Sequence, residues 1–147
     1  SYARGTLLPR EILRDEIANV VVPLFLSGHY DDALSAAFKR VEITVRELGG
    51  FTPEDYGVSL MRAAFGPKGP LTDKNAVKTE QEALSNLFAG AIGFFKNPLS
   101  HREVGIDDAR MAASRILFAN ELMALVHIQK MIMSQDANET EESRSIG

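Results

Sequence analysis

The stretch TEQEALSNLFAGAIGFF, residues 79–95, decides the fold of this chain. Its apolar residues recur at helical spacing and share one face, which predicts an amphipathic helix: Leu84, Leu87, Phe88, Ala91, Ile92 and Phe95. Thr79 followed three residues later by Glu82 is a capping-box pattern, so we expect the helix to begin there.

A second side of the same helix carries Asn86, Ala89, Gly90 and Gly93, which are small except for Asn86. A glycine inside a helix costs about 1 kcal/mol relative to alanine. Two of them indicate a close approach by another backbone, either in the core or across a dimer seam.

Downstream, residues 107–134 predict a second long helix, with Asp107 as its cap. Its apolar residues cannot share a single stripe: Ile116, Leu117, Leu122, Leu125, Val126, Ile128, Met131 and Ile132. A helix that is apolar nearly all round is buried in a core or partly covered by a partner subunit.

Upstream, three further helices are predicted at about residues 8–26, 31–48 and 53–65. Pro9 suits a first helical turn, Asp31 is a candidate N-cap, and Gly49-Gly50 ends the second of these helices. Residues 66–70 form a loop that extends as far as Val77. Since no segment indicates a strand, we expect an all-α bundle of about five helices, with the helices at 79–95 and 107–134 at its centre.

Composition places the chain among globular proteins, with 147 residues, 45% hydrophobic, 24% charged and no cysteine. We predict a domain at residues 1–135 and an acidic disordered tail at 136–147.

No apolar run reaches the roughly 18 residues of a membrane span, and no signal segment opens the chain, so we expect a cytoplasmic protein without membrane contact. The chain begins at Ser1, so a fused N-terminal domain or a partner protein is expected. The net charge of −4 argues mildly against a broad nucleic-acid surface but allows a site for one phosphate.

Candidate chemistry is concentrated in FFKNPLSHRE, residues 94–103. Asn97-Pro98 suits an N-cap and first helical position, and the N–H groups of the turn that follows can face an anion. Lys96 and His101 can then converge on one site, where histidine transfers protons and lysine stabilises phosphate charge. The alternative is a histidine that only caps or hydrogen-bonds a helix end.

Other polar residues carry weaker signals. Glu42 and Arg46 lie one helical turn apart and form either a surface ion pair or the edge of a cleft. His29 is interpreted as a capping or packing residue and His127 as structural. No spacing of histidines or carboxylates suits a metal, so we predict neither a metal nor another cofactor.

Three segments resemble one known family: GHYDDA (28–33), LFAGAIG (87–93) and KNPLSHR (96–102). Over roughly residues 20–131 the chain resembles the C-terminal domain of the Ymh-type bacterial and phage proteins, which belong to the HEPN superfamily (higher eukaryotes and prokaryotes nucleotide-binding). The resemblance implies a helical bundle that dimerises. It also implies a metal-independent endoribonuclease of toxin–antitoxin, CRISPR or antiphage systems. The superfamily motif is an arginine, often followed by a polar residue, and a histidine after four to six intervening residues. Here Lys96 holds the arginine position, Asn97 the polar position and His101 the histidine position.

Two functions follow from this resemblance. In a ribonuclease, the catalytic residues would be His101, Lys96 and Asn97, and a homodimer would form one composite groove. Ser100 and Arg102 would contact RNA. Glu42 and Arg46 would either support the catalytic residues or contact RNA, if their helix borders the cleft. In a non-catalytic module, the same fold would serve dimerisation or nucleotide and RNA binding within a larger protein. Lysine keeps the charge of arginine but loses its bidentate fork. The acidic net charge and the absence of a basic stripe favour the module, whereas the cluster of Lys96, Asn97 and His101 favours the ribonuclease.

Overall fold

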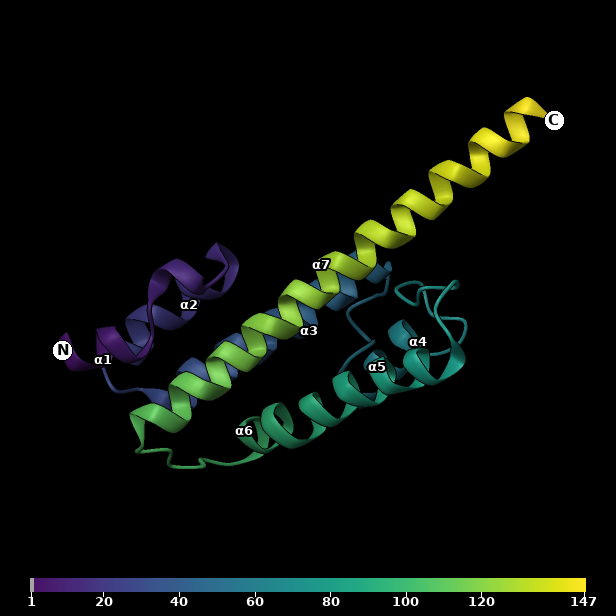
Figure 1. The fold of residues 1–147 in the computed structure, drawn as a ribbon. Coiled ribbons are helices and arrows are strands. Elements are labelled where there is room, and N and C mark those ends of the chain that lie inside the picture. The colour runs from purple at the N-terminus through teal and green to yellow at the C-terminus, as the bar shows by residue number, and fades with distance from the viewer. Residues whose placement is uncertain (1) are drawn as a thin grey trace.

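The computed structural model describes residues 2–147, and side chains from residue 5 onward. These residues form helices and no strand, as predicted, and Figure 1 shows their arrangement. In chain order the elements are α1 (Tyr2–Leu7), the 3-10 turn η1 (Arg10–Ile12), α2 (Asp15–Leu26), α3 (Tyr30–Gly49), α4 (Gly57–Phe65), α5 (Lys78–Ala91), the π-helical turn η2 (Ile92–Lys96), α6 (Asn97–His101) and α7 (Ala109–Ile146).

The centre of the bundle is the pair α3 and α7, which run side by side in the same direction (Figure 1). Helix α2 packs against both, and α4 and α5 pair on the other side of α3. The core is closed by fully buried side chains from most of these helices, among them Phe25, Phe38, Phe65, Phe88, Ile116 and Leu122. The expectation that the helix at 79–95 shares the centre is therefore wrong, because α3 takes that place and α5 packs mainly on α4.

The first predicted helix is divided in the structure. Pro9 precedes the turn η1 instead of opening a long helix, and α2 begins only at Asp15. Pro23 lies in the last turn of α2, and Gly28 follows with a left-handed φ of 79°, so this helix ends where the sequence predicts. Helix α3 ends as predicted too, because Gly50 adopts φ 73° directly after it.

Three predicted helix starts differ from the structure. Helix α4 begins at Gly57 rather than residue 53. Helix α5 begins at Lys78 after Val77, so Thr79 lies inside the helix and makes no capping box with Glu82. Helix α7 is capped by Asp108 rather than Asp107, since the Asp108 carboxylate accepts hydrogen bonds from the backbone N–H groups of Arg110 and Met111.

The two glycines on the small side of the predicted helix, Gly90 of α5 and Gly93 of η2, lie in different environments. A Cβ added at Gly93 would lie 3.2 Å from Val58 Cγ2, so α4 makes the close approach there. A Cβ added at Gly90 would have no other atom within 4 Å. Within the described bundle, the predicted approach of another backbone is therefore found at neither glycine: Gly93 faces a side chain of α4, and the Gly90 surface is open.

Helix α7 continues to Ile146, so the segment 136–147, predicted as a disordered tail, is helical and projects beyond the bundle (Figure 1). In contrast to the sequence-based expectation, α7 is also long and apolar enough to cross a membrane. Core helices of globular proteins can share this length and composition. Helix α7 packs along α3 and buries Ile116 and Leu122, while 33% of its apolar window is buried.

Candidate functional site: an ionic cluster beside a π-helical turn

The site begins with the turn η2, which joins α5 to α6 without a break in the helical path. A π turn contains one extra residue, and such turns are frequent at functional sites. Phe95 points inward and stacks on Phe38 of α3, with ring centroids 5.6 Å apart. Phe94 points outward and is 69% exposed. Lys96, which follows Phe95 in the chain, points toward α3.

Lys96 enters an ionic cluster, which we define as Glu42, Arg46 and Lys96. The Lys96 Nζ lies 3.5 Å from Glu42 Oε2, and the Arg46 Nη2 lies 3.2 Å from Glu42 Oε1. The backbone N–H of Gly57 also donates to Glu42 Oε2 at 3.0 Å. Arg46 Nε donates to the carbonyl of Asp55 at 2.8 Å, so the cluster connects α3, η2 and the segment before α4.

The cluster is sheltered from solvent, with side chains 7% exposed at Glu42, 18% at Arg46 and 17% at Lys96. A buried carboxylate is tolerated when each oxygen has a partner, as both have here. The Glu42–Arg46 pair is thus not a solvent-exposed surface pair. Two cations share one carboxylate, so the cluster carries an excess positive charge next to α6.

The sequence predicted that a new helix begins at Asn97-Pro98, with Asn97 as its N-cap, and the structure differs. The N-cap position is Lys96, itself helical, and the Asn97 N–H donates to the carbonyl of Ile92. Asn97 therefore opens no turn with unpaired N–H groups. Ser100 Oγ donates to the Lys96 carbonyl at 3.3 Å.

His101 is the last residue of α6, and its side chain is exposed. Within residues 2–147, no hydrogen bond or ion pair to its ring is present. The structure thus brings Lys96, Glu42 and Arg46 together and leaves His101 and Arg102 at the surface end of α6. Convergence of His101 and Lys96 on one phosphate stays a prediction.

After His101, the chain is held by a contact that sequence reasoning missed. Asp31 in the first turn of α3 accepts hydrogen bonds from the backbone N–H groups of Val104, Gly105 and Ile106, at 2.7–2.8 Å. Burial raises the pKa of Asp31, but the three N–H donors outweigh it and leave the pKa below its ordinary value. The prediction of Asp31 as an N-cap is therefore wrong, because His29 holds that position. Asp31 instead anchors the segment 102–108, which we call the strap.

The strap borders two hollows. The strap cavity, of about 510 Å³, is lined by residues that include His29, Ser35, Ser100, Arg102 and Glu103. The aromatic cleft, of about 200 Å³, is lined by residues that include Phe94, Phe95, Arg102 and Arg115. Across the described part of the chain, no group of three or more His, Cys, Asp or Glu side chains is placed to hold a metal ion.

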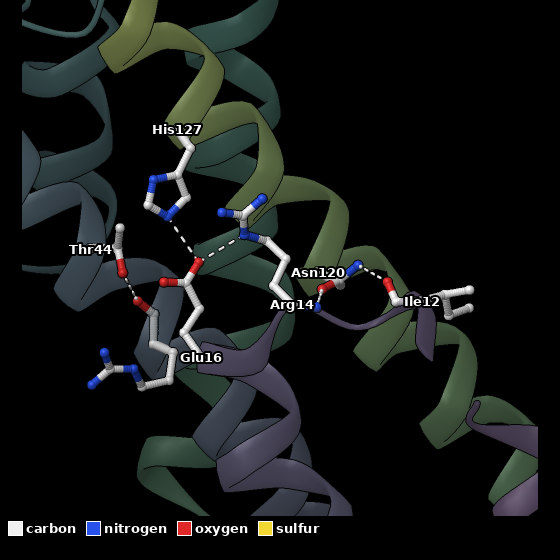
Figure 2. Close-up of polar contacts among 7 residues, drawn as sticks. Ile12, Arg14, Glu16, Thr44, Asn120 and His127 are labelled. Carbon is white, nitrogen blue, oxygen red and sulfur yellow. Dashed lines mark hydrogen bonds and ion pairs between the residues drawn. The ribbon is translucent and has the colours of Figure 1, made fainter. Parts of the chain in front are cut away.

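The other two histidines differ in their contacts. His29 occupies the N-cap position of α3 but makes no capping bond with its side chain. His127 of α7 points at Glu16 of α2, with Nε2 2.8 Å from Oε1, and Arg14 Nε donates to the same oxygen (Figure 2). Burial raises the pKa of Glu16, but the bonds from Arg14 and His127 leave it below its ordinary value.

A second contact holds the same region together. The Asn120 side chain donates to the Ile12 carbonyl and accepts from the Arg14 N–H (Figure 2). Both contacts fasten the N-terminal segment to α7, which agrees with a structural role for His127.

The fold and these contacts define a small helical protein with a sheltered ionic cluster next to a polar helix end. The chain belongs to the Ymh family, described as a protein of unknown function (Hypoth_ymh), whose model matches residues 12–126. Neither a curated protein nor a solved structure matches the chain significantly. The predicted Ymh resemblance is confirmed, and the relation to the HEPN superfamily stays a prediction.

Proposed function

We propose that this protein is a HEPN-type, metal-independent endoribonuclease that acts in the cytoplasm, in a phage-defence or toxin-like system. One observation carries the proposal. Lys96 is fixed at the end of η2 by the buried Glu42, five residues before an exposed histidine whose ring has no bond within the described chain. A positioned cation and a free imidazole are the two groups that phosphodiester cleavage by a ribose hydroxyl requires.

In this mechanism His101 accepts the proton of the ribose 2′-hydroxyl, or protonates the leaving 5′-oxygen. The 2′-oxygen forms a bond to phosphorus and the bond to the 5′-oxygen breaks, which yields a 2′,3′-cyclic phosphate and a 5′-hydroxyl. Lys96 stabilises the developing phosphate charge, and Asn97 orients the phosphate or the imidazole. Glu42 and Arg46 hold Lys96 in place, and Ser100 and Arg102 contact the RNA.

We propose further that the active unit is a homodimer with a seam along α5. Leu87 is 40% exposed, and Gly90 lies one turn further on the same helix with open space above it. Open space above a helix position without a side chain allows a second helix to approach closely. A single monomeric species at about 10 µM, where a stable interface would be occupied, refutes this part of the proposal.

The test of activity compares wild type, His101→Ala and Lys96→Arg on total RNA, with and without a chelator. His101→Ala should lose about 10²–10⁴-fold in rate with an unchanged circular dichroism spectrum. Lys96→Arg should keep or raise the rate, since arginine grips phosphate with two parallel hydrogen bonds. The chelator should change nothing. Equal cleavage by wild type and His101→Ala would assign the activity to another site or to a contaminant.

A second candidate is a catalytically inactive module for dimerisation or for nucleotide or RNA binding. The observation that favours it is the Lys96–Glu42 pair itself, because an ammonium already paired with a carboxylate binds a phosphate less strongly. Under this reading wild type dimerises or binds RNA but cleaves none.

A further inference from the structure

We propose that the aromatic cleft binds one unpaired nucleobase of the RNA, stacked on Phe94, with the adjoining phosphate on Arg102 and Arg115. The inference rests on the proposed function, whose substrate it specifies as single-stranded RNA. Phe94, Phe95 and Arg115 are not part of the catalytic proposal.

The first support is the exposure of Phe94. A phenylalanine ring that is 69% exposed gains little from burial in the folded chain. The ring is nevertheless oriented, because it meets the edge of Phe95 at an interplanar angle of 89° with centroids 5.0 Å apart. Phe95 in turn is fixed between Phe38 and Phe118. An oriented, solvent-facing aromatic ring is a stacking platform for a base.

The second support is the charge of the cleft. Arg115 of α7 holds its guanidinium over the Phe95 ring, with Cζ 5.2 Å from the centroid. Arg102, at the start of the strap, lines the same cleft. In the described structure no carboxylate lines the cleft, and the neighbouring acids Asp31 and Glu103 line the strap cavity instead. Two guanidinium groups beside an aromatic ring, with no carboxylate in the cleft lining, match a base and its phosphate better than an apolar peptide.

The third support is size and position. A volume of about 200 Å³ is below the roughly 300 Å³ where drug-sized pockets begin, so it suits one planar group rather than a whole ligand. Arg102 directly follows His101 in the chain. Phe94 lies seven residues before His101, which is about two helical turns. A base in the cleft would thus place the nearby phosphodiester at the end of α6.

The experiment measures binding of wild type to a short 2′-O-methyl oligoribonucleotide, which has no free 2′-hydroxyl and cannot be cleaved by the proposed chemistry. An abasic oligomer of the same length carries the same phosphates without bases. By fluorescence anisotropy, Phe94→Ala should bind the base-bearing oligomer about 5- to 150-fold more weakly and the abasic one as wild type does. Phe94→Tyr should restore binding. Arg102→Gln should reduce the salt dependence of binding by about one phosphate contact.

Met131→Ala is the matched control, since Met131 is an exposed apolar side chain of α7, 55% exposed, outside the cleft, and it should bind as wild type does. Equal binding by Phe94→Ala and wild type, or equal affinity of wild type for both oligomers, overturns the inference. Conversion of a dimer to a monomer by Phe94→Ala also overturns it, because the ring would then belong to a seam between two copies. Because the probe is not cleaved, loss of the proposed ribonuclease activity in the His101→Ala assay is a separate result from loss of base binding.

Discussion

Replacing Glu42 by glutamine tests the ionic cluster most directly. Glutamine keeps the shape of the side chain and can still accept from Gly57, but it leaves Arg46 and Lys96 without a counter-charge. At separations of 3.2 and 3.5 Å and an effective dielectric constant near 20, each pair has a gross attraction of about 5 kcal/mol. The cost of burying the carboxylate offsets much of this.

Removing one partner from a buried pair costs about 3–5 kcal/mol, and both cations here keep some contact with water. We therefore expect Glu42→Gln to lower the free energy of unfolding by about 2–4 kcal/mol. Urea unfolding followed by circular dichroism measures this value, with the denaturant slope unchanged. Glu47→Gln is the matched control on the exposed side of α3 and should lie within about 0.5 kcal/mol of wild type.

A double-mutant cycle with Lys96→Met separates the pair from the rest of the cluster. We expect a coupling free energy between positions 42 and 96 of about 0.5–3 kcal/mol. If Glu42→Gln is as stable as Glu47→Gln and the coupling is zero, the carboxylate does not hold Lys96, and the observation behind the proposed function is lost.

Three further outcomes are expected. Asp31→Asn should lower the free energy of unfolding by about 1–3 kcal/mol at pH 7, because the three N–H donors of the strap keep only a neutral acceptor. The folded state lowers the pKa of Asp31, so the Asp31 carboxylate contributes to the free energy of unfolding above the ordinary aspartate pKa. This contribution is lost as the pH falls through the pKa of Asp31 in the folded state. Urea titrations should therefore show the free energies of unfolding of wild type and Asp31→Asn converging below about pH 4. Glu16→Gln should show the same direction, with the advantage of wild type shrinking below about pH 4, and an advantage that grows with acid would contradict the assigned contacts. Within a single copy of the chain, Gly90→Ala should raise the free energy of unfolding by about 0.5–1 kcal/mol, because a Cβ there meets no atom and alanine favours the helix. Thermal melts below the concentration at which the protein dimerises measure this gain. A loss of stability at higher concentration alone would place the second helix of the proposed seam against Gly90.

Much of the fold followed from periodicity. The five predicted helices correspond to α2, α3, α4, α5 and α7, and the glycine stops at Gly28 and Gly50 were placed correctly because a left-handed φ leaves a clear local signal. Helix starts were harder. Several polar residues near each start could serve as caps, and the choice between Asp107 and Asp108 depends on backbone geometry that one residue of shift changes.

The candidate site was predictable only in part. Glu42, Arg46 and Lys96 were singled out separately, but their meeting depends on how η2 packs on α3, which no local pattern indicates. The role of Asp31 was missed because its partners lie 73 to 75 residues away and are backbone groups, which carry no side-chain signature. The roles of His101, Asn97, Ser100 and Arg102 in catalysis or binding stay predictions.

The π turn acts as a phase shift in the helical path from Lys78 to His101. Each residue of an α-helix advances the side-chain direction by about 100°, so one surplus residue rotates everything after it by that angle. Ahead of the turn, Phe88 and Ala91 are buried; after it, His101 faces water. A deletion of Ile92 or Gly93 would keep the net charge and nearly the whole composition, yet it would exchange which of Phe94, Phe95 and Lys96 face the interior. Which side chains face solvent at the end of α6 therefore depends on the number of residues in η2 as much as on their identity.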